Sequence, residues 1–314
     1  MANHKIALII PTMDREEDLR IMLNSFVRQT VQIDQIIIVD GSYDEVDHVV
    51  DEYPSLKIDY LRIFPPSLAK QKNAGVKALK PDITLAGYLD DDMELYPDSI
   101  EKMLSFWNDA PSEYGGAGFA IISDHITSKI GSVRSLFGID SDELGKVFSN
   151  GFVSMIENPE KTVDVDWLSG GGSIWRRSVI DSYPYDEWFQ GSGFMEDIDY
   201  SYNISRDYRL VVLAESRLDH HVRQIRGDRN YLLGKWQIIN RLYFVRKNRY
   251  RGLSIMAART ASISIVIVNI LATIGRLDYN RFRMVVGNIA GIFISIMRKD
   301  VQIMGHLKRK KPNQ

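Results

Sequence analysis

The sequence predicts an α/β fold, a mostly parallel sheet with helices on both faces, followed by apolar or amphipathic helices at the C-terminal end. Short β-branched apolar runs alternate with helical periodicity through the first third of the chain, which is the pattern of βαβ units. Polar turns that contain Asp or Gly end several of these runs. With 314 residues, of which 45% are hydrophobic and 25% charged, the chain can bury one large core.

Four segments are expected to be strands, and the first two are expected to be buried because they are short apolar runs rich in β-branched residues. They occupy residues 6–10, 36–39, 58–63 and 83–89. Helical spacing of apolar residues predicts a helix at residues 15–28. A weakly patterned acidic helix is expected at residues 45–52, and another helix at residues 68–79, after Pro65-Pro66. A further helix is expected to begin near Pro97, with Asp98 and Glu101 in its first turn, where negative charge suits the helix dipole.

The later part of the chain has a less regular pattern. Strands are expected at residues 116–122, 163–167 and 209–214, and helices at residues 196–206 and 228–247. A Gly triplet at residues 170–172 precedes a helix that begins near Arg177. The weakest pattern lies between residues 115 and 165, where the sequence predicts little beyond the two strand pieces.

Polar turns follow three of the predicted strands, at Pro11-Thr12, at Asp40-Gly41-Ser42 and at Asp90-Asp91-Asp92. Ligands of open α/β sheets bind beyond the carboxyl ends of the strands. We therefore expect these three turns to gather along one edge of the sheet and to form a site.

Three adjacent carboxylates at Asp90-Asp91-Asp92 repel one another, so a cation is their natural partner. In an extended segment Asp90 and Asp92 point the same way and can share one task, while Asp91 faces elsewhere. Mg²⁺ or Mn²⁺ prefers a few carboxylates together with phosphate oxygens, as in a nucleoside diphosphate. The alternative interpretation is a solvated acidic turn before a helix.

Other polar residues have a structural and a functional interpretation. Asp40 can accept hydrogen bonds from a ribose or a base, or it is a turn residue. Lys72 and Asn73, near a helix start, can bind phosphate or sugar, or lie on a solvated basic face. One acid of Glu196-Asp197-Ile198-Asp199 can act as a general base, or the cluster is an acidic first helical turn. The pair His220-His221 can complete the ligand shell of a divalent metal, or it is an exposed pair or a buried pair whose hydrogen bonds are made within the fold.

Together these segments resemble glycosyltransferase family 2, an inverting family with a GT-A fold. The resemblance covers residues 5–248 and rests on six motifs in order. They are Ile-Ile-Pro-Thr-Met-Asp-Arg from Ile9, Ile-Val-Asp-Gly-Ser from Ile38, Lys-Asn-Ala-Gly from Lys72, Asp90-Asp91-Asp92, Asp-Trp-Leu-Ser-Gly-Gly from Asp166, and Glu196-Asp197. The sequence after Arg241 looks most like the branch of rhamnosyl- and galactofuranosyltransferases.

The resemblance implies a role for each matching residue. It makes Asp197 the catalytic base, and Asp92 a metal ligand with His220 or His221, for Mn²⁺ or Mg²⁺. It assigns donor and nucleotide binding to Pro11, Thr12, Asp14, Arg15, Asp40, Lys72, Asn73, Asp90 and Asp91. It places Trp167, Gly170, Gly171 and Glu196 on the acceptor side. The implied reaction moves a sugar from a nucleotide-diphosphate donor to a hydroxyl of a lipid-linked or other saccharide acceptor, and no nucleic acid is involved.

Two departures from the family pattern stand out. Lys72 replaces the usual Arg, which affects the expected donor contacts, and no QxxRW motif is present, which argues against a processive polysaccharide synthase. A sugar nucleotidyltransferase is an alternative, but the turn after residue 10 lacks the Gly-rich basic loop expected of one. A non-catalytic membrane-bound scaffold with a degenerate site is a second alternative, which the intact acids disfavour.

The expected domains are a catalytic domain at residues 1–248, with a donor half at about 1–115 and an acceptor half at about 116–248, and a membrane-associating tail at 249–314. From Arg241 onward the chain has 15 Lys and Arg against two acids, although the whole chain has a net charge of −2. The uncharged stretches at 260–275 and 284–297 have 16 and 14 residues, fewer than the roughly 20 needed to span a bilayer.

A helical tail on an anionic membrane interface is therefore expected, with a membrane hairpin or a dimerisation surface as alternatives. The chain has no cysteine, and its N-terminus has no basic region followed by a long apolar run. We expect a cytoplasmic protein, peripheral or monotopic on the inner face of the cell membrane.

Overall fold

The computed structural model describes residues 4–122, 143–189, 193–221, 228–276 and 278–297, and the chain divides into two compact units. The first unit comprises Met1–Ile126, Leu144–Lys146 and Met155–Val222, and the second comprises Thr127–Glu143, Val147–Ser154 and Arg223–Gln314. The division falls before residue 228, so the long helix expected at residues 228–247 belongs with the tail and not with the sheet.

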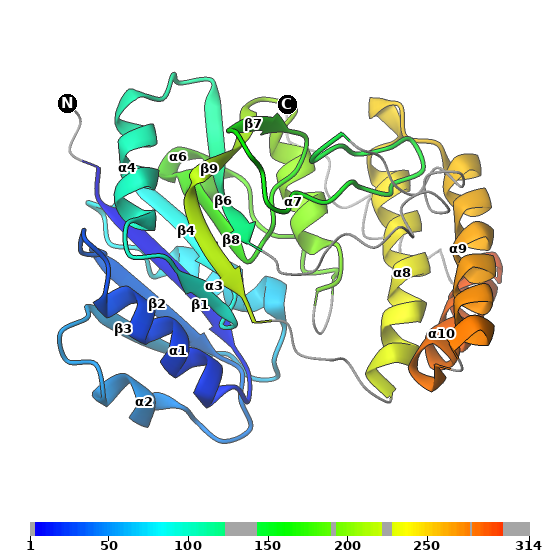
Figure 1. The fold of residues 1–314 in the computed structure, drawn as a ribbon, viewed down its shortest axis with the longest axis horizontal. Coiled ribbons are helices and arrows are strands. Elements are labelled where there is room, and N and C mark those ends of the chain that lie inside the picture. Colours follow the sequence, from blue (N-terminus) through cyan, green and yellow to red (C-terminus); the bar gives the residue numbers. More distant parts are fainter. Residues whose placement is uncertain (1–3, 123–142, 190–192, 222–227, 277, 298–314) are drawn as a thin grey trace. The chain divides into compact units, whose positions relative to one another are not determined.

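The first unit is built on a nine-stranded sheet with the order β3-β2-β1-β4-β8-β6-β9-β5, and β7 pairs with β9 (Figure 1). The strands are β1 Ile6–Thr12, β2 Gln35–Asp40, β3 Ile58–Arg62, β4 Leu85–Leu89, β5 Met93–Leu95, β6 Tyr114–Ile122, β7 Val163–Val165, β8 Gly172–Arg176 and β9 Arg209–His220. The helices of this unit are α1 Glu16–Val27, α2 Asp47–Asp51, α3 Leu68–Lys77, α4 Ser99–Asp109, α6 Arg177–Ser182 and α7 Glu196–Ile204.

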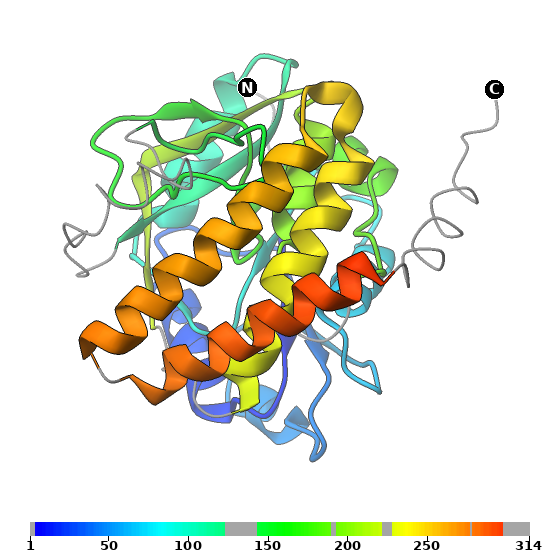
Figure 2. The ribbon, with the colours of Figure 1, turned by 90° about the vertical axis from the view of Figure 1, so that its right-hand side faces the viewer.

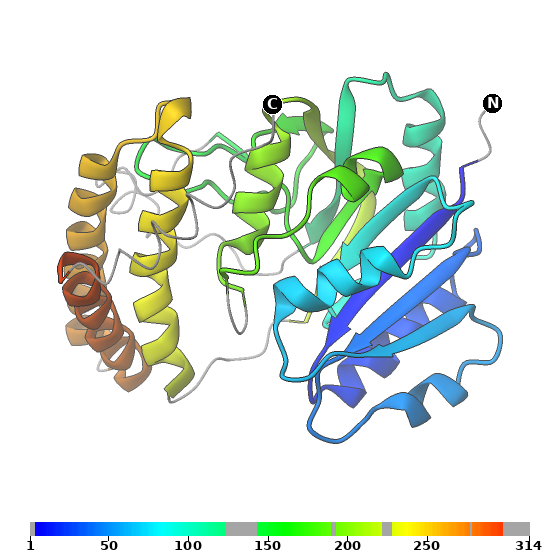
Figure 3. The same cartoon turned by 180° about the vertical axis from the view of Figure 1, so that it is seen from behind.

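Helices cover both faces of the sheet, as the alternating pattern predicts. Side chains of α1 and α4, such as Leu19 and Met103, pack with Leu8 in one buried cluster on one face. On the other face α3 lies so close to β1 that a Cβ at Gly75 would collide with the side chain of Ile9. Figure 1 shows α1 and α4 in front of the sheet, and Figure 3 shows α3 and α6 from behind.

The sheet is parallel only in part. The strands β3, β2, β1 and β4 are parallel to one another, as expected from the βαβ pattern. Strand β8, which the sequence pattern did not reveal, is antiparallel to both β4 and β6. It lies so close to β4 that a Cβ at Gly87 would collide with the backbone of Ser173. The predicted helix at Arg177 begins where β8 ends.

Strand β9 is longer than the expected segment 209–214 and reaches His220. Its final residues pair antiparallel with the short strand β5, so that His220 lies opposite Met93. Neither β5 nor this extension was expected, because each carries too few apolar residues to show a periodicity of its own. Their pairing decides which residues meet at the end of β4.

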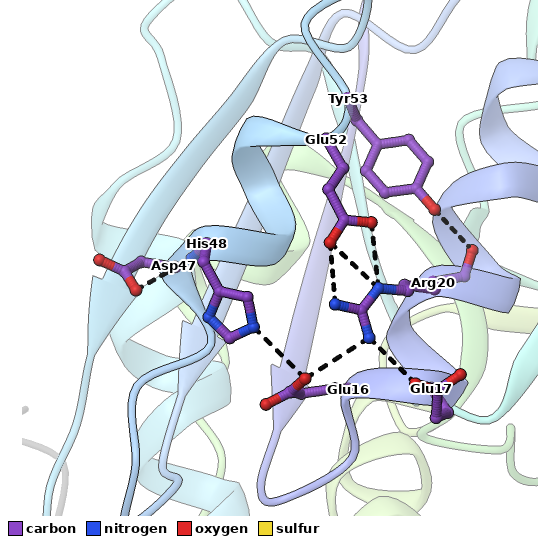
Figure 4. A network of polar contacts seen from close by, with 7 residues as sticks. All are labelled: Glu16, Glu17, Arg20, Asp47, His48, Glu52 and Tyr53. Carbon is purple, nitrogen blue, oxygen red and sulfur yellow. Dashed lines mark hydrogen bonds and ion pairs between the residues drawn. The ribbon is translucent and has the colours of Figure 1, made fainter.

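A surface network of charged groups links α1 to the segment of α2 (Figure 4). The Arg20 guanidinium lies 2.8 Å from Glu52 and 3.1 Å from Glu17, and the backbone carbonyl of Arg20 accepts a hydrogen bond from Tyr53. His48 lies 3.3 Å from Glu16 across the same two helices. The carboxylates of Glu16, Glu17 and Glu52 are exposed, whereas Arg20 is half-buried and Tyr53 is buried. The ion pairs therefore contribute little stability, and they mainly join the acidic helix of residues 47–51 to α1.

In its described residues, the second unit contains three long helices and a short 3₁₀ turn. They are α8 Asp228–Lys247, η1 Arg249–Arg251, α9 Ile255–Arg276 and α10 Tyr279–Ile296, which lie side by side in Figure 2. Helices α8 and α10 are in backbone contact, because a Cβ at Gly234 would collide with the carbonyl of Met284 and one at Gly287 with the carbonyl of Tyr231.

Two buried asparagines join the three helices of this unit. The amide of Asn269 on α9 donates to Asn288 on α10 at 3.0 Å, and Asn288 donates to the carbonyl of Gly234 on α8 at 2.7 Å. Each buried amide therefore has a partner, and these contacts set how α9 packs against the other two helices.

Helix α9 is longer than its uncharged stretch, because the helix starts five residues earlier and includes Arg259. Residues Ile255–Gly275 have a mean hydropathy of 1.9, and by length and composition alone they could cross a membrane. The expectation that this segment is too short to span therefore does not hold for the helix as it is formed. Helix α10 was not identified as a candidate span among the described residues.

Candidate active site

The carboxyl ends of β1, β2 and β4 lie at one edge of the sheet, as the sequence predicts. Thr12 at the end of β1 is in register with Asp40 at the end of β2, and the backbone amide of Gly41 donates to the Thr12 carbonyl at 2.9 Å. Asp90 follows β4, the neighbour of β1 on the other side. The parallel pairing thus brings the three polar turns together.

The segment from Asp90 to Asp92 is a turn, in which the amide of Met93 donates to the carbonyl of Asp90 at 3.1 Å. The alternation expected of an extended segment therefore does not apply, and each carboxylate has surroundings of its own. Asp90 lines a cavity, Asp91 turns toward β1, and Asp92 lies between a guanidinium and an imidazole.

Asp91 is buried at the edge of β1. Its carboxylate accepts hydrogen bonds from the Thr12 hydroxyl and from Arg15 Nη1, both at 2.8 Å. Burial raises the pKa of Asp91 to about 7, although Arg15 and Thr12 act in the opposite direction. Asp91 therefore ties the end of β4 to Thr12 and Arg15, two residues expected to face the donor.

Asp92 lies between two cationic groups. Arg15 Nη1 is 2.8 Å from one carboxylate oxygen, and His220 Nε2 is 3.5 Å from the other. Burial opposes ionisation of Asp92, but the hydrogen bond and charge of His220, together with Arg15, outweigh it and lower its pKa. The same hydrogen bond raises the pKa of His220 above that of a free histidine.

The two adjacent histidines have different partners. Strand β9 pairs His220 with Met93 and so turns the His220 ring toward Asp92. The ring of His221 instead lies 2.9 Å from Glu94 at the surface, and only its backbone amide reaches Asp92. Of the two ligands that the sequence left open, the geometry favours His220.

A cavity of about 180 Å³ adjoins these groups within the first unit. Its wall carries Asp90, Asp197 and His220, which come from three separate parts of the chain. The other lining residues are Met93, Gly118, Phe119, Ile121, Met155, Ile156, Glu157, Trp167, Leu168, Ser169, Gly172 and Val212. The wall is thus largely apolar with a few polar groups, as in sites for small molecules.

Asp197 is held in the first turn of α7 by two backbone amides. Its carboxylate accepts hydrogen bonds from Gly170 at 3.2 Å and from Ile198 at 2.8 Å. The loop from 169 to 171 approaches so closely that a Cβ at Gly170 would lie 2.7 Å from Asp197 Cβ, and one at Gly171 would collide with the carboxylate of Asp90. Both glycines are therefore required by close packing.

Lys72 and Glu196 form a buried ion pair. Lys72 Nζ lies 3.1 Å from the Glu196 carboxylate and 3.1 Å from the carbonyl of Gly170, and its side chain is 0% exposed. Burial raises the pKa of Glu196 to about 8, even beside the Lys72 cation. The structure thus places Lys72, expected at the donor, against the loop of residues 169–171, whose glycines were expected on the acceptor side.

Two further residues that were expected to bind the sugar donor form hydrogen bonds within the protein. Asp40 is fully buried and accepts hydrogen bonds from the Ser42 and Val46 amides and from the Tyr60 hydroxyl. Asn73 exchanges two hydrogen bonds with the backbone of Tyr185. In this structure both side chains fasten the loops around the site.

Asp14 lies in the turn that follows β1. It is exposed, has a φ of 54°, and its side chain accepts a hydrogen bond from the Tyr43 amide at 3.1 Å. Its own amide donates to the Ser42 hydroxyl at 2.8 Å. Asp14 therefore links the turn after β1 to the turn after β2 through these two hydrogen bonds.

The residues around Asp92 fit a hard divalent cation. Asp92 and His220 would supply an oxygen and a nitrogen ligand, and Asp90 Oδ1 is buried without a hydrogen-bond partner among the described residues. The described residues contain no group of three or more His, Asp or Glu that would hold a metal alone. Mg²⁺ and Mn²⁺ take several ligands from phosphate and water, so two or three protein groups suffice.

The sequence matches the profile of "Glycosyl transferase family 2" over residues 7–179, more than half of the chain. The chain belongs to glycosyltransferase family 2. This glycosyltransferase is 28% identical over 208 residues to a Bacillus subtilis (strain 168) protein named uncharacterized glycosyltransferase YwdF, covering 66% of this chain and 70% of that protein.

Solved structures share the fold of this glycosyltransferase. The S. aureus TarS fragment 1–349 in complex with UDP has a TM-score of 0.50 and 14% identity, covering 93% of this chain and 91% of that chain. GalNAc-T7 with UDP, GalNAc and Mn²⁺ has a TM-score of 0.53 and 15% identity, covering 70% of this chain. The chain spans only 43% of GalNAc-T7 and 55% of a longer TarS chain. These similarities show that the fold is of the GT-A type.

The glycosyltransferase has one group of site residues that no sequence pattern indicated. Tyr88 on β4 and Tyr185 in the loop after α6 lie with their rings near Lys72 Nζ, and Tyr200 on α7 packs against both rings. Tyr185 and Tyr200 are stacked with ring centroids 4.1 Å apart, and Tyr88 meets Tyr185 edge-on at 5.0 Å. Their separation in the sequence exceeds any helical or strand period, so only the packed structure reveals them.

Proposed function

We propose that this protein transfers a hexosyl or deoxyhexosyl group from a nucleoside-diphosphate sugar to a hydroxyl of a saccharide acceptor, with inversion at the anomeric carbon. The observation that carries the proposal is the single cavity wall that holds Asp90, Asp197 and His220. Complexes of UDP with relatives of the same fold support a nucleoside diphosphate as the donor. The residues after Arg241 favour the rhamnosyl- and galactofuranosyltransferase branch, and the tail favours a lipid-linked acceptor.

Asp197 is the general base in this proposal. Two backbone amides orient its carboxylate at the cavity wall, and it accepts the proton of the acceptor hydroxyl. The oxygen of that hydroxyl forms a bond to the anomeric carbon as the bond from that carbon to the diphosphate breaks on the opposite side. The bonding electron pair leaves with the diphosphate, so one in-line displacement inverts the configuration.

The groups at the ends of β1 and β4 serve the donor. Asp90 contacts the ribose side, and the exposed part of Arg15 supplies positive charge beside Asp92. Mn²⁺ or Mg²⁺, held by Asp92 and His220 when bound, supplies positive charge that stabilises the departing diphosphate. Trp167, which lines the cavity beside Asp197, faces the acceptor.

The test combines ligand binding with sugar transfer. UDP and other nucleoside diphosphates, each with and without Mn²⁺, should raise the melting temperature of the wild type if they bind the folded state. Asp197→Asn should keep this stabilisation and lower kcat by roughly 10²–10⁴-fold. Asp92→Asn should lose it. Asp181→Asn, which alters an exposed pair with Arg177, is the matched control and should change neither.

Two outcomes contradict the proposal. Unchanged transfer by Asp197→Asn would show that Asp197 is not the base. Absence of stabilisation and transfer with every nucleotide tested would instead favour the non-catalytic scaffold.

We also propose that α9 and α10 rest on the anionic inner face of the cell membrane. Their exposed side chains form an apolar surface, which includes Ile263, Ile267, Leu271, Ile274, Phe282, Ile289, Phe293 and Ile296. Arg259, Arg281 and Arg283 on the same helices supply charge for acidic headgroups. The polar Asn269 and Asn288 are buried inside the bundle, which leaves the outer face apolar.

Flotation with vesicles tests this attachment. Binding should require anionic lipid and weaken with salt, because basic side chains contribute to it. The double variant Ile267→Glu/Phe293→Glu should abolish binding, whereas Val27→Glu, at an exposed position of the first unit, should not. Resistance of the bound protein to extraction by high salt and alkali would instead support α9 as a spanning helix.

A further inference from the structure

Lys72 is a cation enclosed by the first unit. It lies on α3, its side chain is 0% exposed, and it is not among the residues that line the cavity beside Asp197. A buried ammonium is costly unless hydrogen bonds and opposite charges compensate it. The groups that compensate Lys72 therefore indicate what it does.

Two of these groups belong to the acceptor side of the site. Lys72 Nζ donates to the carbonyl of Gly170 and to the carboxylate of Glu196, each at 3.1 Å. It also lies 4.9 Å from the ring centroid of Tyr185 and 5.7 Å from that of Tyr88. Burial opposes the charge, but Glu196, with the more distant Asp90 and Asp197, outweighs burial and raises the pKa of Lys72. Lys72 is thus a cation at neutral pH.

Both hydrogen-bond partners of Lys72 are directly connected to Asp197. Gly170 presents its carbonyl to Lys72 and its amide to Asp197, so one peptide residue joins the two side chains. Glu196 precedes Asp197 in the first turn of α7. The packing is close, since a Cβ at Gly170 would lie 2.7 Å from both Lys72 Nζ and Asp197 Cβ.

We propose that Lys72 is a positioning residue for Asp197, which holds the 169–171 loop and the start of α7 together, and that it does not bind the donor. The inference rests on the proposed role of Asp197 as the base. It differs from the role in donor binding that the resemblance implies for this position. Lys72 suits the task because its three N–H groups reach two fixed oxygens while tyrosine rings enclose the rest of the charge.

Lys72→Met tests the proposal, with Lys70→Met on the same helix as the matched control because Lys70 is exposed. We expect Lys72→Met to lower kcat by about 10²-fold, since a displacement of about 1 Å at a reacting group has that effect. The dissociation constant for UDP with Mn²⁺ should change by less than about twofold, because no donor contact is lost. Lys72→Arg, which keeps the charge, should recover part of kcat.

The double variant Lys72→Met/Glu196→Gln covers the case in which Lys72→Met fails to fold. It removes the buried Lys72 cation together with the carboxyl group that pairs with it, so no buried charge is left without a partner, and the variant should fold and still show the low kcat. Hydrogen exchange gives a readout that needs no transfer. The Gly170 amide, which donates to Asp197, should exchange faster in the variants than in the wild type.

The outcomes separate the possibilities. A weaker affinity for UDP with kcat unchanged would show that Lys72 binds the donor, and it would overturn the proposal. Unchanged hydrogen exchange of the Gly170 amide in the variants would overturn the proposal as well. An inactive wild type that shows the faster exchange in the variants would contradict the proposed function but leave the structural role of Lys72 in place.

Discussion

Arg15 Nη1 lies 2.8 Å from a carboxylate oxygen of Asp92, and the same atom reaches Asp91 at 2.8 Å. A guanidinium thus neutralises the carboxylate that is expected to hold a divalent cation. A cation that binds Asp92 must compete with this contact, so the two are coupled through one carboxylate.

Arg15→Gln should therefore increase the affinity for Mn²⁺ measured without nucleotide. We expect about a tenfold gain, because a charge-assisted hydrogen bond of about 1.5 kcal/mol no longer has to be broken. Isothermal titration calorimetry with the metal alone measures the effect, and Arg177→Gln at an exposed ion pair is the control. A loss of Mn²⁺ affinity in Arg15→Gln would contradict the competition.

The two histidines should respond differently to substitution. His220→Ala removes a group 3.5 Å from Asp92 and should weaken the Mn²⁺-dependent binding of UDP by about tenfold or more, as expected for a lost metal ligand or its support. His221→Ala removes a surface contact with Glu94 and should have little effect. Binding is measured by thermal shift with and without Mn²⁺. Equal effects of the two variants would disprove the assignment of His220.

Glu196 should make stability depend on pH. Its pKa is raised to about 8 in the folded state, against about 4.5 when unfolded, so between these pH values the folded state binds more protons. Its contribution is complete below pH 4.5 and is lost as the pH rises toward 8. Lys72 does not titrate in this window, because its pKa is raised above 10.5.

The wild type should therefore lose more stability between about pH 5 and pH 8 than Glu196→Gln, which does not titrate. Thermal unfolding at a series of pH values gives the comparison. If the melting temperatures of the two proteins changed with pH in parallel, Glu196 would be ionised throughout this range and the prediction would be wrong.

Gly75 should not tolerate a side chain. A Cβ at Gly75 would collide with the buried side chain of Ile9, so Gly75→Ala should reduce the free energy of unfolding by about 1–3 kcal/mol despite the higher helix propensity of Ala. Gly275→Ala is the control, because no atom lies within 4 Å of its added Cβ and helix propensity should make it neutral or stabilising. Unfolding in urea measures both, and equal stabilisation would contradict the packing of α3 on β1.

Much of the fold could be predicted from local patterns. Apolar runs such as residues 6–10 and 36–39 are buried strands on both faces, so their composition alone indicated β1 and β2. Strand β8 could not be recognised, because it is short and begins with Gly172-Ser173 directly before a helix. Strand β5 has three residues and exists only because β9 pairs with it.

The candidate site was predictable to a similar extent. The turns after β1, β2 and β4 were expected at one edge because parallel strands share a direction, and the register of Thr12 with Asp40 agrees with this. The environments of the individual side chains were not predictable. Burial of Asp40 and Lys72 depends on Tyr60, Tyr185 and Glu196, which come from other elements.

The sequence by itself determined the α/β class, the family and the order of the acidic and glycine motifs, because each depends on residues that are neighbours in the chain. Only the tertiary structure decided that His220 rather than His221 turns toward Asp92, and that Lys72 lies beneath the loop of Gly170. Both depend on contacts between distant segments. The first depends on the pairing of β9 with β5, and the second on the contact of Lys72 on α3 with Glu196 on α7. Such contacts produce no periodic pattern in the sequence, because they form only when the chain packs around its core.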